Sequence, residues 1–349
     1  MRKVGCHTSH TQPTNLRLKM PNIAVIGSGS WATAIVKLLS EKDTRIQWWM
    51  RKPEYVDHVK RYRHNKNYLS DVTIDLSKVT PTADLEQALD GADTAFLVVP
   101  SAFLKPVLEQ AGPLLQGKLI ASGVKGIVPD DNELITDYLE KRFGLDSTKM
   151  CILSGPCHAE EIAMEKQSYL TIGGLDKSQG RKVANMLACR YLKTTISPDL
   201  FGLEYASIIK NIAAIACGIA HGLNYGDNFM AVLVAGSLYE LDAFLHKASP
   251  YKGRKVTASG YAGDMLVTCY SQFSRNRTFG TMIGRGYSVK AAQMEMNMIA
   301  EGYYASRCIH EMNQAQWQVQ MPIVDSVYRI LYGKEPSASV FKELESLIA

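Results

Sequence analysis

Short apolar runs alternate with helix-like patterns over the first half of the chain, from about residue 22 to residue 196. The expected strands are 22–26, 45–50, 94–99, 118–122, 150–153, 169–172 and 192–196. Helical spacing of apolar residues lies between them, near 31–41, 84–90, 101–111, 130–142 and 177–189. Strands that alternate with helices are typical of a doubly wound parallel sheet. We therefore expect an α/β domain.

The strand pattern ends after about Pro198, and successive helices follow. They are expected near 203–222, 228–247, 288–297, 304–315, 321–332 and 337–348. We divide the chain into an extension (1–20), an α/β nucleotide-binding domain (21–200) and a separate all-α domain (201–349) that carries substrate and catalytic residues. The extension is interpreted as a superfluous leader, with a transit-like segment or a disordered tail as alternatives.

Charge and cysteine content exclude several classes of protein. The 349 residues carry a net charge of +5, but residues 1–20 hold four bases and no acid, so the rest carries only +1. That balance argues against a nucleic-acid partner. No uninterrupted run of about 18 apolar residues occurs, so we expect no integral membrane segment. The seven cysteines form no C-x-x-C pair, which favours free thiols in a reducing compartment.

The first expected strand leads into Gly27-Ser28-Gly29-Ser30-Trp31-Ala32 and then an apolar helix. This is a G-x-G-x-x-G/A pattern in the correct place. Gly27 allows the turn, Gly29 lets the backbone approach a pyrophosphate, and Ala32 permits close packing of helix on strand. The pattern predicts dinucleotide binding at the helix N-terminus. The alternative is a tight turn that binds no ligand.

Two cations, Arg51 and Lys52, follow the second strand, where an NAD site usually offers an acid to the ribose 2′-hydroxyl. Cations at that position suit the 2′-phosphate of NADP. We expect NADP or NAD as cofactor, with NADPH slightly favoured. The alternative is an ordinary solvated basic turn.

Lys210 is the single charge in the apolar segment 205–220 and has small residues on its own helix face. Burying an ammonium is costly unless it is paired or useful. Partial burial also lowers a lysine pKa toward the range of a general acid or base. We take Lys210 as the catalytic candidate. The alternative is a lysine whose stem reaches the surface.

Three further segments carry ligand-binding side chains. Segment 263–277 contains Asp264, Thr268, Ser274, Arg275 and Asn276, and Arg beside Asn can grip a phosphate. Taken alone, it is more typical of an exposed loop. Segment 154–161 follows an apolar strand with a Gly-Pro turn, and Lys125 directly follows another strand. Both are expected at the carboxyl edge of the sheet, where ligands bind.

Five of these features together resemble the NAD(P)-dependent glycerol-3-phosphate dehydrogenases: the glycine turn, Lys125, and segments 154–161, 205–220 and 263–277. The most specific stretch runs from Lys210 to Gly218 and on to Asn228. The resemblance implies a Rossmann-like domain, a helical domain, and a cytoplasmic, often dimeric enzyme that supplies the backbone of phospholipids. We accordingly expect a homodimer, and no metal site.

The family's functional positions fall on residues of this chain. Its catalytic lysine falls on Lys210. Its substrate positions fall on Lys125, Gly155, Cys157, Lys210, Asp264, Ser274, Arg275 and Asn276, to which we add Asn211 and Thr268. Its cofactor positions fall on Ser30, Trp31, Arg51, Lys125, Ala159, Arg275, Ile299 and Glu301, to which we add Gly27, Gly29 and Lys52.

The chain departs from the family pattern at a few positions. The Gly-Pro-Ser/Thr-Phe-Ala motif is here Gly155-Pro156-Cys157-His158-Ala159, which replaces a hydroxyl with a weaker thiol donor. His221 replaces a usual acid, and the approach to Asp264 is rearranged. These changes bear on substrate affinity. The reaction implied is reduction of dihydroxyacetone phosphate to glycerol 3-phosphate. Rival hypotheses are a two-domain reductase of a carboxylate or sugar acid, and a non-enzymatic nucleotide sensor or DNA regulator.

Overall fold

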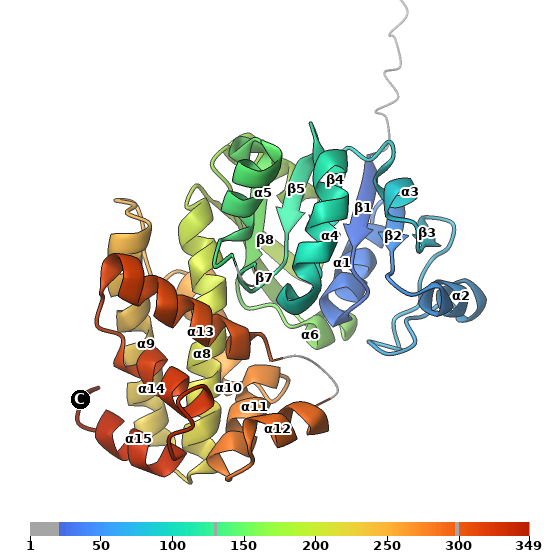
Figure 1. Ribbon diagram of the computed structural model, residues 1–349. Helices are drawn as coiled ribbons and strands as arrows, with labels where there is room; N and C mark the ends of the chain where they lie inside the picture. Colours follow the sequence, from blue (N-terminus) through green and yellow to red (C-terminus); the bar gives the residue numbers. More distant parts are fainter. Residues whose placement is uncertain (1–20, 129–130, 297–299, 349) are drawn as a thin grey trace, which may run out of the picture.

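The computed structural model describes residues 21–128, 131–296 and 300–348, and Figure 1 shows a sheet-containing part joined to a group of helices. Within these residues the strands form an eight-stranded sheet in the order β3-β2-β1-β4-β5-β6-β7-β8. The strands are β1 (Asn22–Ile26), β2 (Arg45–Trp49), β3 (Val79–Thr82), β4 (Thr94–Leu97), β5 (Leu119–Ser122), β6 (Met150–Ser154), β7 (Ser168–Gly173) and β8 (Leu192–Ser197). The doubly wound α/β prediction is confirmed.

One strand pair departs from the prediction of a parallel sheet. β6 and β7 pair antiparallel, whereas the other neighbours are parallel. The connection between them contains only the five-residue helix α6 (Ala159–Ala163). That helix is too short to carry the chain back along the sheet, as a parallel crossover requires.

Helices cover both faces of the sheet. α1 (Ser30–Ser40), α2 (Pro53–Tyr62), α6 and α7 (Lys177–Leu187) contribute to one core, where they meet Val25 and Phe96. α3 (Leu85–Leu89), α4 (Leu104–Ala111) and α5 (Ile135–Phe143) contribute to the other, where they meet Ile26 and Leu97. Successive strand residues therefore enter opposite cores, as the two-residue repeat of a strand requires.

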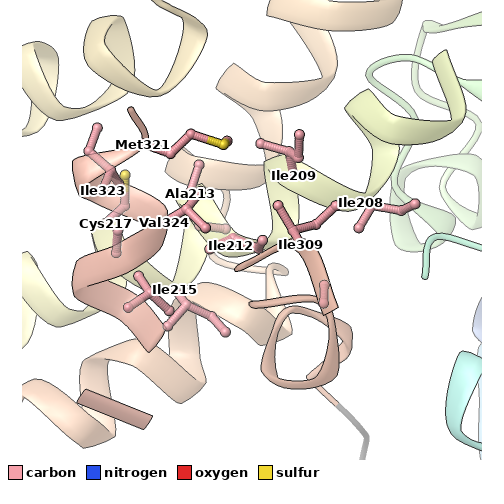
Figure 2. Packing of buried hydrophobic residues seen from close by; sticks show 14 of the residues in the cluster. Ile208, Ile209, Ile212, Ala213, Ile215, Cys217, Ile309, Met321, Ile323 and Val324 are labelled. Atoms are coloured by element: carbon pink, nitrogen blue, oxygen red, sulfur yellow. The ribbon is translucent and has the colours of Figure 1, made fainter. Parts of the chain in front are cut away.

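A second group of helices is built around α8 (Leu200–Gly222), which carries Lys210. The others are α9 (Asp227–Ala248), α10 (Asp264–Tyr270), α11 (Arg275–Gly284), α12 (Val289–Glu295), α13 (Glu301–Met312), α14 (Pro322–Leu331) and α15 (Ser337–Leu344). Figure 2 shows isoleucines of α8 packed against Ile309 of α13 and Val324 of α14. The predicted helical second half is present. Segment 263–277 contains all of α10 and the first residues of α11, and is not the exposed loop considered above.

Glycines bring α11 unusually close to α8. A Cβ added at Gly218 would overlap the carbonyl oxygen of Arg277, and one added at Gly280 would overlap that of Ile215. The two helix backbones therefore touch. This contact places the first turn of α11, with Arg275 and Asn276, beside the middle of α8.

Two helices, α8 and α9, are long and apolar enough to cross a membrane by length and composition alone. Both were predicted as helices, but the search for uninterrupted apolar runs did not identify them as long enough and apolar enough to cross a membrane. In α8, 94% of the apolar window is buried inside the fold, against 44% in α9. α8 is therefore a core helix, whose apolar surface is covered by protein.

Candidate active site

A cavity of about 350 Å³ lies where the carboxyl edge of the sheet faces α8, α10 and α11. Its sheet side is formed by the start of α1 and by the segments that follow β4, β5 and β6. The strand order reverses between β1 and β4, and ligands of open α/β sheets bind at such a reversal. Its opposite side includes Lys210, Asp264 and Arg275.

The glycine turn is shaped for a dinucleotide. Gly27 has a φ of +135°, and a Cβ there would overlap the carbonyl of Val98. Gly29 caps α1, and a Cβ added to it would meet no atom within 4 Å, so open space faces the backbone. The first turn of α1 has no acid and no side-chain cap. Its N–H groups are thus available to a pyrophosphate.

Trp31 supports the same interpretation. Its indole Nε1 is buried and makes no hydrogen bond with any residue that the structure describes. The indole lines the cavity, and the ammonium of Lys125 lies 5.9 Å from its ring centroid. A buried unpaired donor beside an anion-binding turn fits a bound ligand that would accept its hydrogen.

Arg51 and Lys52 are both exposed and lie outside the cavity lining. The guanidinium of Arg51 stacks 4.5 Å above the ring of Phe103, which does line the cavity. Lys52 instead pairs with Glu54 at 3.5 Å and faces Tyr55. Arg51 is therefore held at the rim of the cavity through Phe103, whereas Lys52 contacts residues of the first turn of α2.

Lys210 is buried and its ammonium forms an ion pair with Oδ1 of Asp264. The alternative of a lysine that reaches the surface is therefore wrong. The carboxylate is fixed from its other side, since its Oδ2 accepts a 3.0 Å hydrogen bond from the N–H of Gly155. Lys125 lies 3.7 Å from the same oxygen. Two ammonium groups thus share one carboxylate.

This arrangement sets the protonation of the pair. The pKa of Lys210 is lowered to about 7, mainly by burial; the charge of Asp264 opposes this shift and the charge of Lys125 adds to it. For Asp264, burial would raise the pKa, but the charges of Lys125 and Lys210 outweigh it and hold the pKa below its usual value. Near neutral pH the lysine can therefore both give and take a proton, while the aspartate stays charged.

A chain of hydrogen-bonded amides joins α8, α11, α13 and the segment after β5 beside Lys210. Asn276 of α11 donates to the side-chain oxygen of Asn211 on α8 at 2.9 Å, and Asn211 donates to the carbonyl of Lys125 at 2.9 Å. The carbonyl oxygen of the Asn276 side chain accepts from the N–H of Gly302 at 2.9 Å. These bonds hold the first turn of α11 in place relative to the sheet.

Other predicted residues also have structural partners. The Thr268 hydroxyl donates to the Asp264 carbonyl at 2.6 Å, and Ser274 caps α11 by accepting from the Arg277 N–H at 3.3 Å. Arg275 donates to the Ser30 hydroxyl at 3.3 Å, which links α11 to the glycine turn. Glu301 accepts a 3.1 Å hydrogen bond from the Ser101 N–H, across the two halves of the chain.

Most of the predicted site residues meet at the cavity. Its lining includes Gly29, Ser30, Trp31, Lys125, Cys157, Ala159, Lys210, Asn211, Asp264, Thr268, Ser274, Arg275, Asn276 and Glu301. Four others lie outside the lining: Gly27, Arg51, Lys52 and Gly155. Ile299 lies outside the described residues.

The prediction of site residues omitted His158 and Phe103, which line the cavity, and Ser101, which donates a hydrogen bond to Glu301. His158 lies inside the motif Gly155-Pro156-Cys157-His158-Ala159, where the family pattern has Phe. That departure could have marked His158 as a candidate from the sequence. Ser101 and Phe103 follow β4, and nothing in their local sequence distinguishes them. Within the described ranges, no three His, Cys, Asp or Glu side chains gather where they could hold a metal ion.

Comparisons with known proteins place the chain in a family. A model described as the N-terminus of NAD-dependent glycerol-3-phosphate dehydrogenase matches residues 22–179, and one for the C-terminus matches residues 199–342. The chain belongs to this dehydrogenase family. The resemblance inferred from the sequence is thereby confirmed.

Individual relatives agree. The chain is 33% identical to the glycerol-3-phosphate dehydrogenase (NAD(P)+) of Syntrophomonas wolfei, over 93% of this chain and 94% of that one. Identity to the corresponding enzyme of Bacillus velezensis is 33%, over 95% and 94%. The crystal structure of the glycerol-3-phosphate dehydrogenase of Coxiella burnetii has a TM-score of 0.87 at 28% identity and covers 93% of this chain and 98% of that one.

Proposed function

We propose that this chain interconverts dihydroxyacetone phosphate and sn-glycerol 3-phosphate, with NADPH or NADH as the reductant. The observation that carries the proposal is the buried Lys210–Asp264 pair, which lies in one cavity with the glycine turn and Arg275. The cavity thus combines a proton donor of suitable pKa, a place for a dinucleotide and a cation for a phosphate.

The protein's part in the reaction follows from these positions. The bound cofactor supplies a hydride for C2 of the ketone. Protonated Lys210 gives its proton to the carbonyl oxygen, which becomes the C2 hydroxyl, and the lysine is left neutral. In the reverse direction neutral Lys210 takes that proton. Asp264 keeps the ammonium aimed into the cavity through its own hydrogen bond from Gly155.

Arg275 and Asn276 are proposed to hold the substrate phosphate. Both lie in the first turn of α11, whose N–H groups and dipole also favour an anion. The guanidinium offers two parallel donors to phosphate oxygens. Ser274 and Lys125 flank them in the cavity lining.

The cofactor is proposed to lie along the start of α1, with its pyrophosphate at Gly29 and Ser30. Gly27, Trp31, Ala159 and Glu301 would surround it, and Arg51 would reach a 2′-phosphate from the rim. NADPH is slightly favoured on this basis.

The assembly and setting are also proposals. We propose a cytoplasmic homodimer that supplies glycerol 3-phosphate for phospholipid synthesis. Exposed Val232 and Tyr239 on α9 offer apolar surface to a second copy, since that helix is only partly covered. A domain boundary near residue 200 is supported by the end of β8 at Ser197 and the start of α8 at Leu200.

Neither rival hypothesis has a specific observation in its favour. A reductase of a carboxylate or sugar acid would not require the Ser274-Arg275-Asn276 cluster beside Asp264. A nucleotide sensor or DNA regulator would require a basic surface, and the chain after residue 20 is nearly neutral.

The test compares kcat/KM for dihydroxyacetone phosphate with kcat/KM for unphosphorylated dihydroxyacetone. Each reaction is monitored by the loss of absorbance of the reduced cofactor. We expect the phosphorylated ketone to be strongly preferred. Arg275→Lys keeps the charge but loses the planar pair of donors, so KM for dihydroxyacetone phosphate should rise by about tenfold or more. Similar kcat/KM for both ketones in the wild type would contradict phosphate recognition.

A further inference from the structure

His158 lies in the cavity lining directly after the turn that follows β6. It is the N-cap residue of the short helix α6 but makes no side-chain capping hydrogen bond, and its ring centroid lies 6.3 Å from that of Phe273, another lining residue. Its Nε2 is buried and makes no hydrogen bond within the described part of the chain. An unpaired buried nitrogen destabilises a protein, and a ligand group that pairs with it removes that penalty.

The ring is neutral at physiological pH. The pKa of His158 is lowered to about 4, mainly by burial and then by the positive charges of Lys210 and Lys125, while a hydrogen bond to the backbone of Val267 and the charge of Asp264 oppose the shift. His158 lies three residues after Gly155, whose N–H donates to Asp264, and it lines the same cavity as both lysines, so the imidazole is close to the reacting end of the cavity. A neutral imidazole there suits an uncharged polar group, and the same charges disfavour the imidazolium that would attract a phosphate.

We propose that His158 is a specificity-determining residue that hydrogen-bonds the C1 hydroxyl of the substrate ketone. This inference rests on the proposed function. Arg275 and Asn276 hold the phosphate on C3 and Lys210 serves the oxygen on C2, which leaves the hydroxymethyl group. Among the side chains that line the cavity, only His158 and Trp31 have a buried nitrogen without a partner in the described part of the chain, and Trp31 is placed beside the cofactor. An alcohol both donates and accepts, so it pairs with either tautomer of the ring.

The test compares two ketones that differ only at C1. Hydroxyacetone phosphate keeps the carbonyl and the phosphate of dihydroxyacetone phosphate but has hydrogen in place of the C1 hydroxyl. The ratio of kcat/KM for the two ketones is measured in the wild type, in His158→Phe and in His158→Gln. Differences in the ketones' own reactivity are common to all three proteins and cancel when the ratios are compared.

We expect the wild type to prefer dihydroxyacetone phosphate by about tenfold or more, because a site built to bind a hydroxyl rejects the analogue that lacks it. His158→Phe keeps a planar ring without a polar atom, so its preference should fall at least about fivefold. His158→Gln places an amide where Nε2 lies and should keep the preference within about twofold. His246→Phe, an exposed histidine on α9, is the matched control and should leave the ratio unchanged.

An unchanged ratio in His158→Phe would overturn this inference while the proposed function stood. A change confined to KM for the cofactor would also overturn it, since the nitrogen would then face the nicotinamide. His158→Leu provides the same comparison if the Phe variant does not fold. A wild type that does not reduce dihydroxyacetone phosphate would instead defeat the proposed function itself.

Discussion

Lys210 is buried beside Asp264 and Lys125, so its charge depends on pH in the neutral range. Its pKa is lowered from the usual 10.5 to about 7, mainly by burial and also by the charge of Lys125, while the charge of Asp264 opposes the shift. A lysine with that pKa donates a proton below about pH 7 and accepts one above it. Forward and reverse reactions should therefore respond oppositely to pH.

We predict that kcat/KM for ketone reduction falls by about tenfold per pH unit above pH 7, because protonated Lys210 is lost. Glycerol 3-phosphate oxidation should rise as pH approaches 7 and then level off, because it needs the neutral amine. Asp264→Asn removes the charge that supports the ammonium, so it should shift both profiles to lower pH. Profiles that are flat between pH 6 and 9, or unmoved in Asp264→Asn, would assign the proton transfer to another group.

At the rim, Arg51 is the residue proposed to read the cofactor's 2′-phosphate. Arg51→Asp should lower kcat/KM for NADPH relative to NADH by about tenfold, because a charge-assisted bond becomes a repulsion. Exposure limits the effect. Lys52→Asp is the matched control, since Lys52 is already paired with Glu54, and it should change the ratio much less. An unchanged NADPH/NADH ratio in Arg51→Asp would mean that this cation does not contact the phosphate.

Among the elements, the contact of α8 with α11 determines the position of Arg275 and Asn276, the residues proposed to bind the phosphate. Gly218 and Gly280 let the two backbones touch, and the amide chain from Asn276 to Asn211 depends on that approach. The position of α11 is therefore set by two glycines outside the cavity lining together with the asparagine bonds inside it.

We predict that Gly280→Ala lowers the free energy of unfolding by about 1–3 kcal/mol, because the added methyl group must push the helices apart. KM for dihydroxyacetone phosphate should rise in the same variant, since Arg275 and Asn276 move with α11. Gly226→Ala is the matched control, because a Cβ at that helix cap meets no atom within 4 Å. Chemical denaturation and steady-state kinetics measure both effects; equal behaviour of the two variants would contradict the role given to the helix contact.

The same elements show how far the sequence could be interpreted. Strongly apolar strands and α8 were predicted because their patterns are long or uninterrupted. β3 was missed because it is a four-residue edge strand that contains Pro81, and α2 because only Val56 and Val59 are buried in it. α10 and α11 were missed because their starts are rich in the polar residues of the site.

Some site residues could be predicted from the local sequence, and others depend on contacts that only the folded chain shows. Lys210 was predictable because a lone charge in an apolar helix requires a partner. Its bond to Asp264, and that of Asp264 to Gly155, join segments far apart in the sequence, and only the folded chain shows them. His158 also lines the cavity. It is singled out because its Nε2 has no hydrogen-bond partner among the described residues, and that can be seen only once the surrounding residues are in place.

At the scale of the whole molecule, neither half contains the site by itself. The sheet provides the glycine turn and Lys125, and the helices provide Lys210, Asp264 and Arg275. The halves are joined through buried polar groups: Glu204 of α8 accepts hydrogen bonds from the first N–H groups of α5, at 2.8 Å from Ile135. Glu301 of α13 likewise accepts from Ser101. Substrate and cofactor are therefore expected to meet between the two halves.

The most direct test of this account is the reaction of Lys210→Ala with dihydroxyacetone phosphate, measured together with cofactor binding by fluorescence titration. If Lys210 is the proton donor, kcat should fall by about 100-fold or more while the Kd of NADPH stays nearly unchanged. A variant that keeps more than about half of the wild-type kcat would contradict the central claim.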